Sequence, residues 1–392
     1  MAAGFSWRSR SLRNTALQTG FVAGLGAVIV LGIIEARSNL AAQGLTSGFD
    51  FLWKATAWEM NFTLLPAGPS DPYWWYLVLG ILNTLFMGVL GLTGATVLGL
   101  GIGMLRSARN PAARLIGTIY IELFRNLPLI VQLFFWYALA NSLPGPRQAI
   151  AAGGLLLSSR GVYLPGLAVS QGAAALAVAF AVAGIAACLW IGFARRFDRL
   201  DSGPRRRLMA SAFGLTLAAM AVTLAAGHAP GTPWVSLPEL QGLKISGGLR
   251  IQPEFYCLAI AIVTYGAAYI GEIVRGGFKA VGHGQIEAAR ALGLTPWQVF
   301  SRVQMPLAFR AMLPILINQY VWLIKATTLG IAVGFSDFFM VIATSITHSG
   351  QTIEFIGILM AGFLAINFSL AAVLNRLNRA IALKGHQIGG AA

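Results

Sequence analysis

The chain has 392 residues, of which 57% are apolar and only 10% are charged, and its formal net charge is +15. Soluble domains usually contain roughly 25% charged residues, so this composition excludes an ordinary soluble protein and indicates an integral membrane protein. In such a chain the positions of the basic residues carry more information than their sum, so the excess charge does not indicate nucleic acid binding.

Apolar runs long enough to cross a bilayer recur along the whole chain. A spanning helix needs about 20 mainly apolar residues. Because lipid offers no hydrogen bonds to the backbone, such runs without strand-like alternation predict an all-α integral membrane bundle. We expect about eight transmembrane helices, at residues 20–36, 76–105, 115–140, 172–193, 208–227, 255–274, 313–335 and 354–375.

The first run follows three arginines between residues 8 and 13, so it also resembles a secretory signal peptide. Glu35 and Arg37 make a poor small-residue cleavage site, and we predict that the run is retained as the first helix. Residues 1–75 then comprise the N-terminus, this helix and an outer interfacial segment.

That outer segment is rich in aromatic residues. Phe49, Leu52, Trp53 and Ala57 stand near helical spacing, and YWWY at 73–76 leads into the second run. These aromatic residues are typical of an interfacial helix and an aromatic belt. A loop packed on the bundle is the alternative.

The lysines and arginines predict the orientation. Twenty of them fall in segments on the side of the N-terminus, and five fall in loops on the other side. This imbalance predicts that both termini lie in the cytoplasm. The glycine clusters GFVAG at 20–24 and GLGIG at 99–103 lie in spanning runs, where close helix packing is their natural role.

The fourth and fifth runs resemble an insertion. They are poor in polar residues, rich in Ala and Gly, and flanked by loops containing Pro, Gly and Ser. Because two added helices bring the chain back to the same side of the membrane, they do not change the orientation of the later segments. We predict an inserted module at about residues 146–252 within a transmembrane domain of residues 76–380, followed by a tail, 381–392. The basic turn at 194–208 anchors topology or contacts anionic lipid.

A polar stretch, QIEAARALGLTPWQVFSRVQMPLAFR at residues 285–310, separates the sixth and seventh runs. Good helix formers lead to Gly293, which favours a helix end, and Thr295 with Pro296 begins a second helix. Pro306 then marks the point where the chain returns to the membrane. The sequence predicts a compact cytoplasmic helical hairpin, which either docks another protein or packs on its own bundle.

The sequence EAARALGLTPWQVFSRVQMP resembles the EAA loop found in the membrane subunits of binding-protein-dependent ABC transporters. Val303 and Met305 replace the usual Ile and Leu of that pattern. The resemblance implies that residues 284–306 form a coupling helix seated on an ATPase subunit. The positions that match the pattern, and so are expected to couple to the ATPase, are Glu287, Ala288, Ala289, Gly293 and Pro306.

The resemblance extends over residues 80–145 and 253–380, which are similar to the polar amino acid class of these permeases, the histidine and glutamine type. It implies a type I importer core of five helices, here with one N-terminal helix and the inserted pair added, as in the long permeases of general L-amino-acid systems. The implied substrate is a polar or general L-amino acid. Another small polar solute, such as an opine, an amine or an amino acid derivative, is the alternative.

The partners are also implied by the resemblance: two ATPase subunits that hold ATP and Mg, a second permease, identical or paralogous, and a periplasmic substrate-binding protein. The setting would be the bacterial inner membrane, with lipid around the bundle. The chain itself contains no G-x-x-x-x-G-K-[ST] loop, and its histidines lack metal-ligand spacing, so we expect no cofactor, metal or catalytic residue on it. An ion-gradient-driven secondary transporter is a further alternative, although neither inverted repeats nor broken helices are visible.

Charged residues inside predicted spans are costly and therefore candidates for function. Glu122 with Arg125, and Glu272 with Arg275, stand three residues apart and are candidate structural ion pairs. Lys325 has no acidic residue within one helical turn.

A zwitterionic substrate needs fixed partners of both signs. We hypothesise that Lys325, with Thr327 and Thr328 nearby, meets a substrate carboxylate, and that Glu122 meets its ammonium group. A lysine held in a structural salt bridge is the alternative.

Overall fold

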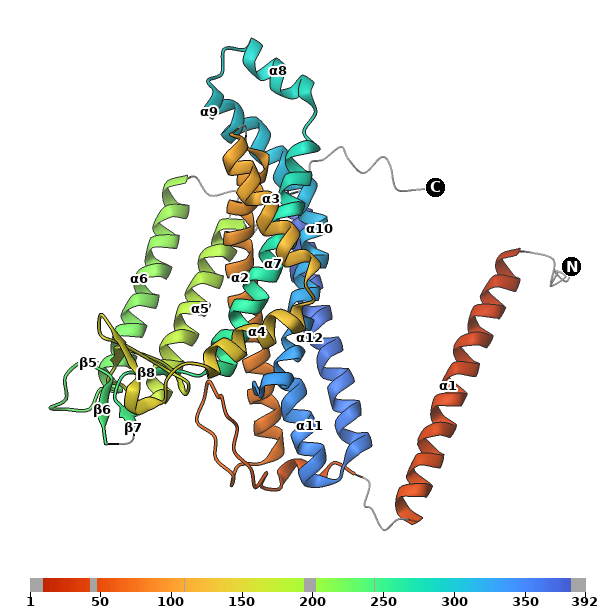
Figure 1. The fold of residues 1–392 in the computed structure, drawn as a ribbon. Helices are drawn as coiled ribbons and strands as arrows, with labels where there is room; N and C mark the ends of the chain where they lie inside the picture. Colours follow the sequence, from red (N-terminus) through yellow and green to blue (C-terminus); the bar gives the residue numbers. More distant parts are fainter. Residues whose placement is uncertain (1–9, 43–47, 109, 194–201, 243, 382–392) are drawn as a thin grey trace, which may run out of the picture.

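The fold is seen in a computed structural model that describes residues 10–42, 48–108, 110–193, 202–242 and 244–381 (Figure 1). Its helices are α1 (Arg10–Ala42), α2 (Tyr73–Ser107), α3 (Pro111–Asn126), α4 (Leu129–Asn141), α5 (Gln171–Phe193), α6 (Ser202–Ala226), α7 (Pro253–Lys279), α8 (His283–Ala291), α9 (Pro296–Gln298), α10 (Met305–Ala326), α11 (Phe338–Ser349) and α12 (Thr352–Ile381). Short helices η1 (Asp50–Trp53), η2 (Pro146–Gln148), η4 (Val299–Gln304) and η5 (Thr327–Val333) complete the helical segments.

Within these ranges, seven helices are long and apolar enough to cross a membrane, or eight if the bent pair α3 and α4 makes one crossing. The predicted helical membrane bundle is therefore confirmed. The expected third span at 115–140 is wrong as a continuous helix, because α3 and α4 meet at an angle of 99°. The break lies at Leu127 and Pro128.

Pro128 explains the bend between α3 and α4. Proline lacks an N–H and pushes the residue before it out of the helical region, so the helix ends ahead of it. Gln132 Nε2 then donates to the carbonyl oxygens of Phe124, at 2.9 Å, and Leu127, at 3.0 Å. The buried amide thus satisfies carbonyl groups that the break leaves without helical partners.

Helices α2 and α7 form the centre of the bundle, and glycines let their backbones approach closely. A Cβ built on Gly99 would lie 2.8 Å from Ile270, and one on Gly103 would lie 2.6 Å from Val274. Larger residues at these two positions would force the helices apart. The expected packing role of the cluster at 99–103 is confirmed at Gly99 and Gly103, whereas a Cβ built on Gly20 or Gly24 would have no neighbour within 4 Å among the described residues.

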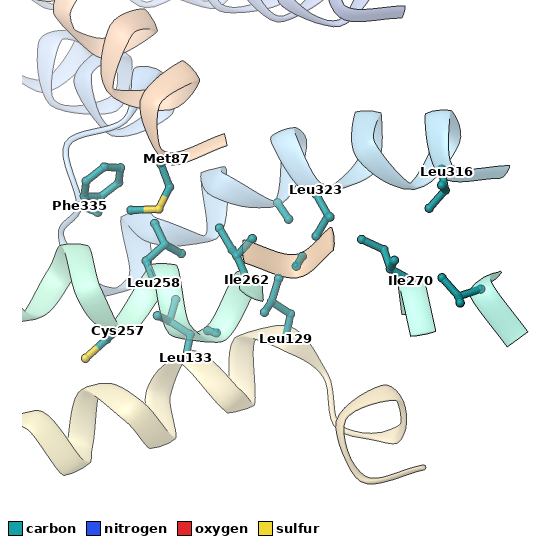
Figure 2. Close-up of a cluster of buried hydrophobic side chains, with 14 of the residues drawn as sticks. Met87, Leu129, Leu133, Cys257, Leu258, Ile262, Ile270, Leu316, Leu323 and Phe335 are labelled. Atoms are coloured by element: carbon teal, nitrogen blue, oxygen red, sulfur yellow. The ribbon is translucent and has the colours of Figure 1, made fainter. Parts of the chain in front are cut away.

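The hydrophobic core lies between α2, α4, α7 and α10 (Figure 2). Leu133, Leu258 and Leu323 are fully buried there, and Phe335 closes one end of the cluster. Helix α1, by contrast, stands apart from the bundle and is exposed along its apolar length (Figure 1).

The expected seventh span also changes character along its length. Helix α10 gives way at Thr327 to the 3₁₀ helix η5, which ends at Gly334, where φ is +84°. Asn83 Nδ2 donates to the carbonyl of Ser336 at 2.7 Å, and the Phe338 N–H donates to Thr84 Oγ1 at 2.9 Å. Two buried polar residues of α2 therefore hold this turn, which leads into the short helix α11.

The inserted pair α5 and α6 rests on a small β module. A four-stranded sheet has the order β1 (Ile150–Ala152), β2 (Leu155–Ser158), β3 (Gly161–Leu164) and β8 (Leu249–Ile251), all antiparallel. Two further pairs join β4 (Gly166–Leu167) to β5 (Val235–Ser236) and β6 (Glu239–Gln241) to β7 (Lys244–Ser246). Because β3 pairs with β8, the two ends of the insertion are tied together close to its expected limits of 146 and 252.

The outer segment before α2 is a packed loop instead of an interfacial helix. Within residues 48–72 only η1 is helical, and the centroid of its Phe51 ring lies 4.7 Å from that of Phe355 in α12. Trp53, in contrast, is 75% exposed. The expected basic turn falls largely on residues 194–201 and the expected tail on residues 382–392, both of which lie outside the described residues.

Candidate functional site

The predicted hairpin is present and projects beyond the bundle at the end where α7 stops (Figure 1). Helix α8 ends at Ala291, and Gly293, two residues later, has a left-handed φ of +77°. The Leu294 N–H donates to the Ala289 carbonyl at 3.3 Å, and the Gly293 N–H donates to the Arg290 carbonyl at 2.9 Å. This pair of bonds is the Schellman ending that glycine favours.

The second arm begins with a capping box. The Thr295 N–H donates to Gln298 Oε1 at 2.9 Å, while the Gln298 N–H donates to Thr295 Oγ1 at 3.4 Å. The chain then passes through the π-helical turn η4 directly into α10. The second arm is thus continuous with α10, which is long and apolar enough to cross a membrane.

Internal packing makes the hairpin rigid. Ala289 and Val299 are both 4% exposed. The Phe300 ring stacks on Phe278, at the end of α7, with the ring centroids 5.9 Å apart. Ala289 therefore packs within the chain, whereas Glu287 and Ala288 are exposed.

The tip of the hairpin presents large apolar side chains to the outside. Leu292 is 82% exposed and Trp297 is 71% exposed. Apolar groups presented on a rigid support are typical of a protein docking surface. Glu287 adds a charged group on the same hairpin.

A charged network crosses the bundle close to the hairpin. Arg106 of α2 donates from Nη1 to Glu272 Oε2 at 2.5 Å and from Nη2 to Glu122 Oε1 at 3.1 Å. Glu272 also accepts hydrogen bonds from Arg275. The network therefore joins α2, α3 and α7.

The predicted pair of Glu272 with Arg275 is formed. The predicted pairing of Glu122 with Arg125 is wrong, because the structure pairs Glu122 with Arg106. Arg125 instead lies over the ring of Tyr269, with 5.3 Å between its guanidinium carbon and the ring centroid. Spacing along one helix could not reveal a competing arginine on α2.

Aromatic and charged side chains form a polar stripe, which we define as Arg125, Tyr269, Tyr265, Trp322 and Lys325. The Tyr265 hydroxyl donates to the Tyr269 hydroxyl at 3.1 Å, and the Trp322 ring stacks on Tyr265 with centroids 5.2 Å apart. Lys325 follows one turn after Trp322 and is exposed. These contacts connect α3, α7 and α10 along the bundle.

Lys325 lies in the last turn of α10. No salt bridge to Lys325 occurs within the described ranges, so the alternative of a structural ion pair is not seen in the single chain. Beside it, the Thr328 hydroxyl donates to the Lys325 carbonyl at 2.8 Å. Thr327 is fully buried and its hydroxyl donates to the Ile324 carbonyl, which turns it away from any substrate.

The structure does not bring Glu122 to Lys325. Glu122 shares Arg106 with Glu272 of α7, whereas Leu323, two residues before Lys325, lies against Gly266 of α7. Six residues of α7 separate Gly266 from Glu272, and two further residues of α10 lead to Lys325, so the two levels are about 12 Å apart along the bundle at 1.5 Å per residue. The ammonium and carboxylate of an α-amino acid are joined through one carbon atom. One bound amino acid therefore cannot contact both residues, and the proposed role of Glu122 toward the ammonium group is dropped.

Several polar residues of the site were missed at the sequence level. Asn83, Thr84 and Gln132 stood inside apolar runs and were not singled out, although all three are buried and hydrogen-bonded. A polar residue within an apolar spanning run could have indicated them, because such a side chain is costly in the membrane unless it has a hydrogen-bond partner. Tyr265 and Tyr269 carried no signal beyond aromatic composition.

No cluster of three or more His, Cys, Asp or Glu side chains with metal-binding geometry occurs in the part of the chain that the structure describes. The features that the described residues do show are the polar stripe, the charged network and the apolar tip of the hairpin.

Sequence comparison places the chain more narrowly. Residues 95–383 match the family described as binding-protein-dependent transport system inner membrane component, and the chain belongs to this family. It is 35% identical over 387 residues to the putative amino-acid ABC transporter permease protein YhdX of Escherichia coli strain K12, covering 96% of this chain and 97% of that protein.

Two further relatives match over nearly their full length. The chain is 33% identical to the general L-amino acid transport system permease protein AapQ of Rhizobium johnstonii, covering 97% of this chain and 96% of the relative. It is 31% identical to the glutamate/glutamine/aspartate/asparagine transport system permease protein BztB of Rhodobacter capsulatus, covering 93% of this chain and 91% of the relative.

Proposed function

We propose that this chain is a permease subunit of an ATP-driven importer that moves general L-amino acids across the inner membrane of a bacterium. The observation that carries the proposal is the rigid hairpin, continuous with α10 and exposing Leu292 and Trp297. Membership of the family supports a coupled, binding-protein-dependent system. The names of the long relatives support an amino acid substrate.

The hairpin would couple the bundle to a separate ATPase subunit. In this proposal Leu292 and Trp297 enter an apolar groove on the partner, and Glu287 contacts its rim. When two ATPase subunits close on ATP and Mg, the hairpin moves with them. Because Phe300 stacks on Phe278 and η4 leads into α10, the motion reaches both α7 and α10.

The polar stripe would line the substrate pathway. Polar side chains at membrane depth are expected to face a protein partner or water, because lipid cannot satisfy them. A second permease, identical or paralogous, would cover the stripe and leave a path between the subunits. Lys325, beside Thr328, then offers its ammonium group to the carboxylate of a substrate delivered by an external binding protein.

The substrate class and the energy source can be tested together. The chain is purified with its co-expressed partners and reconstituted into proteoliposomes, and uptake of a panel of radiolabelled L-amino acids is measured with the binding protein added. We expect uptake that needs ATP and is insensitive to ionophores. Uptake abolished by an ionophore would indicate a secondary transporter, and uptake of an opine or amine in place of amino acids would contradict the substrate class.

A further inference from the structure

A cavity of about 790 Å³ lies at the end of the bundle that carries the hairpin. The end of α2, the start of α3, the end of α7 and the hairpin surround it. Among the described residues, its lining includes four cationic side chains, Arg106, Arg114, Arg275 and Lys279, together with His283, and no carboxylate. The cavity is therefore suited to an anion.

Two of the four cations have carboxylate partners and two do not. Arg106 and Arg275 bind Glu272 in the charged network. Arg114 and Lys279 are exposed, and neither makes a salt bridge within the described ranges. Their positive charge is available to a ligand.

A second, apolar groove of about 690 Å³ continues from this cavity along α2. It is lined by Gly94, Val97, Leu98, Gly101, Ile102, Leu105 and the two residues that it shares with the basic cavity, Met104 and Ala108. The groove runs from the charged end of α2 toward the middle of the bundle. Leu98 lies eight residues before Arg106, or about 12 Å deeper along the helix.

The length of α2 places the two hollows at different depths of the bilayer. The helix has 35 residues, which correspond to about 52 Å, whereas the hydrocarbon layer is about 30 Å thick. If the surplus of about 22 Å is shared between the two ends, about 11 Å of α2 extends beyond the hydrocarbon at each end. Arg106, in the last turn of α2, then lies in the headgroup layer, whereas Gly94 and Val97 lie in the hydrocarbon and Leu98 lies at its edge. A basic pocket above an apolar groove matches a phospholipid with an anionic headgroup.

We propose that this composite site binds an anionic phospholipid, with its phosphate between Arg114 and Lys279 and an acyl chain along the groove of α2. Phe278, Phe300 and Gln304 also line the basic cavity. The lipid would therefore contact the base of the hairpin and hold it against α7. The inference requires only that the bundle spans a membrane and is independent of the transported substrate.

The test measures lipid binding to the purified, delipidated full chain by native mass spectrometry. Phosphatidylglycerol is compared with phosphatidylcholine of the same acyl chains, and we expect tighter binding of phosphatidylglycerol. Combining Arg114→Gln with Lys279→Gln should weaken phosphatidylglycerol binding about thirtyfold, equivalent to ~2 kcal/mol at ~1 kcal/mol per basic residue. Phosphatidylcholine binding should not change.

Matched control variants distinguish binding at this site from a general attraction between the basic protein and an anionic lipid. Arg206→Gln with Arg207→Gln removes the same charge from α6 and should leave phosphatidylglycerol binding unchanged. Gly101→Leu fills the groove at a position with no neighbour within 4 Å and should weaken binding, whereas Gly214→Leu, at an equally open position on α6, should not.

Three outcomes would overturn the proposal. The first is equal loss of phosphatidylglycerol binding in the α6 charge control and the cavity variant, which would indicate a general charge effect. The second is unchanged binding in Gly101→Leu. The third is displacement of phosphatidylglycerol by inorganic phosphate at comparable concentration, which would indicate a site for free anions in place of a lipid.

Discussion

Gly293 is the residue on which the shape of the hairpin depends, because its φ of +77° is costly for any residue with a side chain. Gly293→Ala should destabilise the turn by about 1 kcal/mol and weaken the stimulation of ATP hydrolysis by loaded binding protein. Gly284→Ala provides a matched control, since Gly284 lies in α8 with open space around it. Equal stimulation in the two variants would contradict the role of the turn.

Lys325 is the residue that we expect to meet the substrate. Lys325→Met should abolish amino acid uptake in the reconstituted complex while the subunits still assemble, because the substrate carboxylate loses its cationic partner. Lys325→Arg keeps the charge and should retain part of the uptake. Normal uptake by Lys325→Met, with normal assembly on size-exclusion chromatography, would exclude the substrate role.

At the scale of elements, α2 and α7 pack through glycine, and two neighbouring glycines of α2 provide a matched test. Gly103→Leu should destabilise the bundle by about 1–3 kcal/mol or more, because Val274 occupies the space that the new side chain needs. Gly101→Leu should leave stability unchanged. Thermal unfolding in detergent measures both, and an equal loss of stability would contradict the packing described here.

The bend between α3 and α4 depends on Gln132. Gln132→Leu should lower the free energy of unfolding by about 1–3 kcal/mol, because the carbonyl groups of Phe124 and Leu127 lose their buried donor. Asn318→Leu, at an exposed position on α10, serves as the control. Unchanged thermal stability of Gln132→Leu would show that water satisfies these carbonyls equally well.

Most of the helices could be predicted from the sequence, because a run of apolar residues has no other stable form in lipid. The bend at Pro128 could not be predicted, although the proline itself is plain in the sequence. A membrane helix can continue through a proline when neighbouring groups bond to the freed backbone carbonyls, and only the fold shows whether such groups are present. The strands of the inserted module, each only a few residues long, have too little periodicity to be recognised. The partner of Glu122 came from another helix, and the polar stripe depends on contacts between three helices.

At the scale of the whole molecule, one continuous helical segment connects the hairpin to the polar stripe. The segment from Pro296 to Val333 begins at the docking surface and passes Trp322 and Lys325. The charged network joins α2, α3 and α7 beside it. A push on the hairpin is therefore expected to alter the path lined by the stripe, which is the physical requirement for coupling ATP hydrolysis to transport.

The central claim is that the hairpin docks on an ATPase subunit. Its most direct test is photo-crosslinking in cells that express the whole transport system, with a photoreactive amino acid placed at Leu292 or, as a control, at Trp53. Both side chains are large, apolar and exposed. Trp53 packs near Trp74 in the first turn of α2, whereas Leu292 directly follows α8 in the hairpin, beyond the other end of α2. We predict that position 292 captures the ATPase subunit and that position 53 does not. Absence of the ATPase subunit from the products at position 292, or equal capture at position 53, would contradict the account.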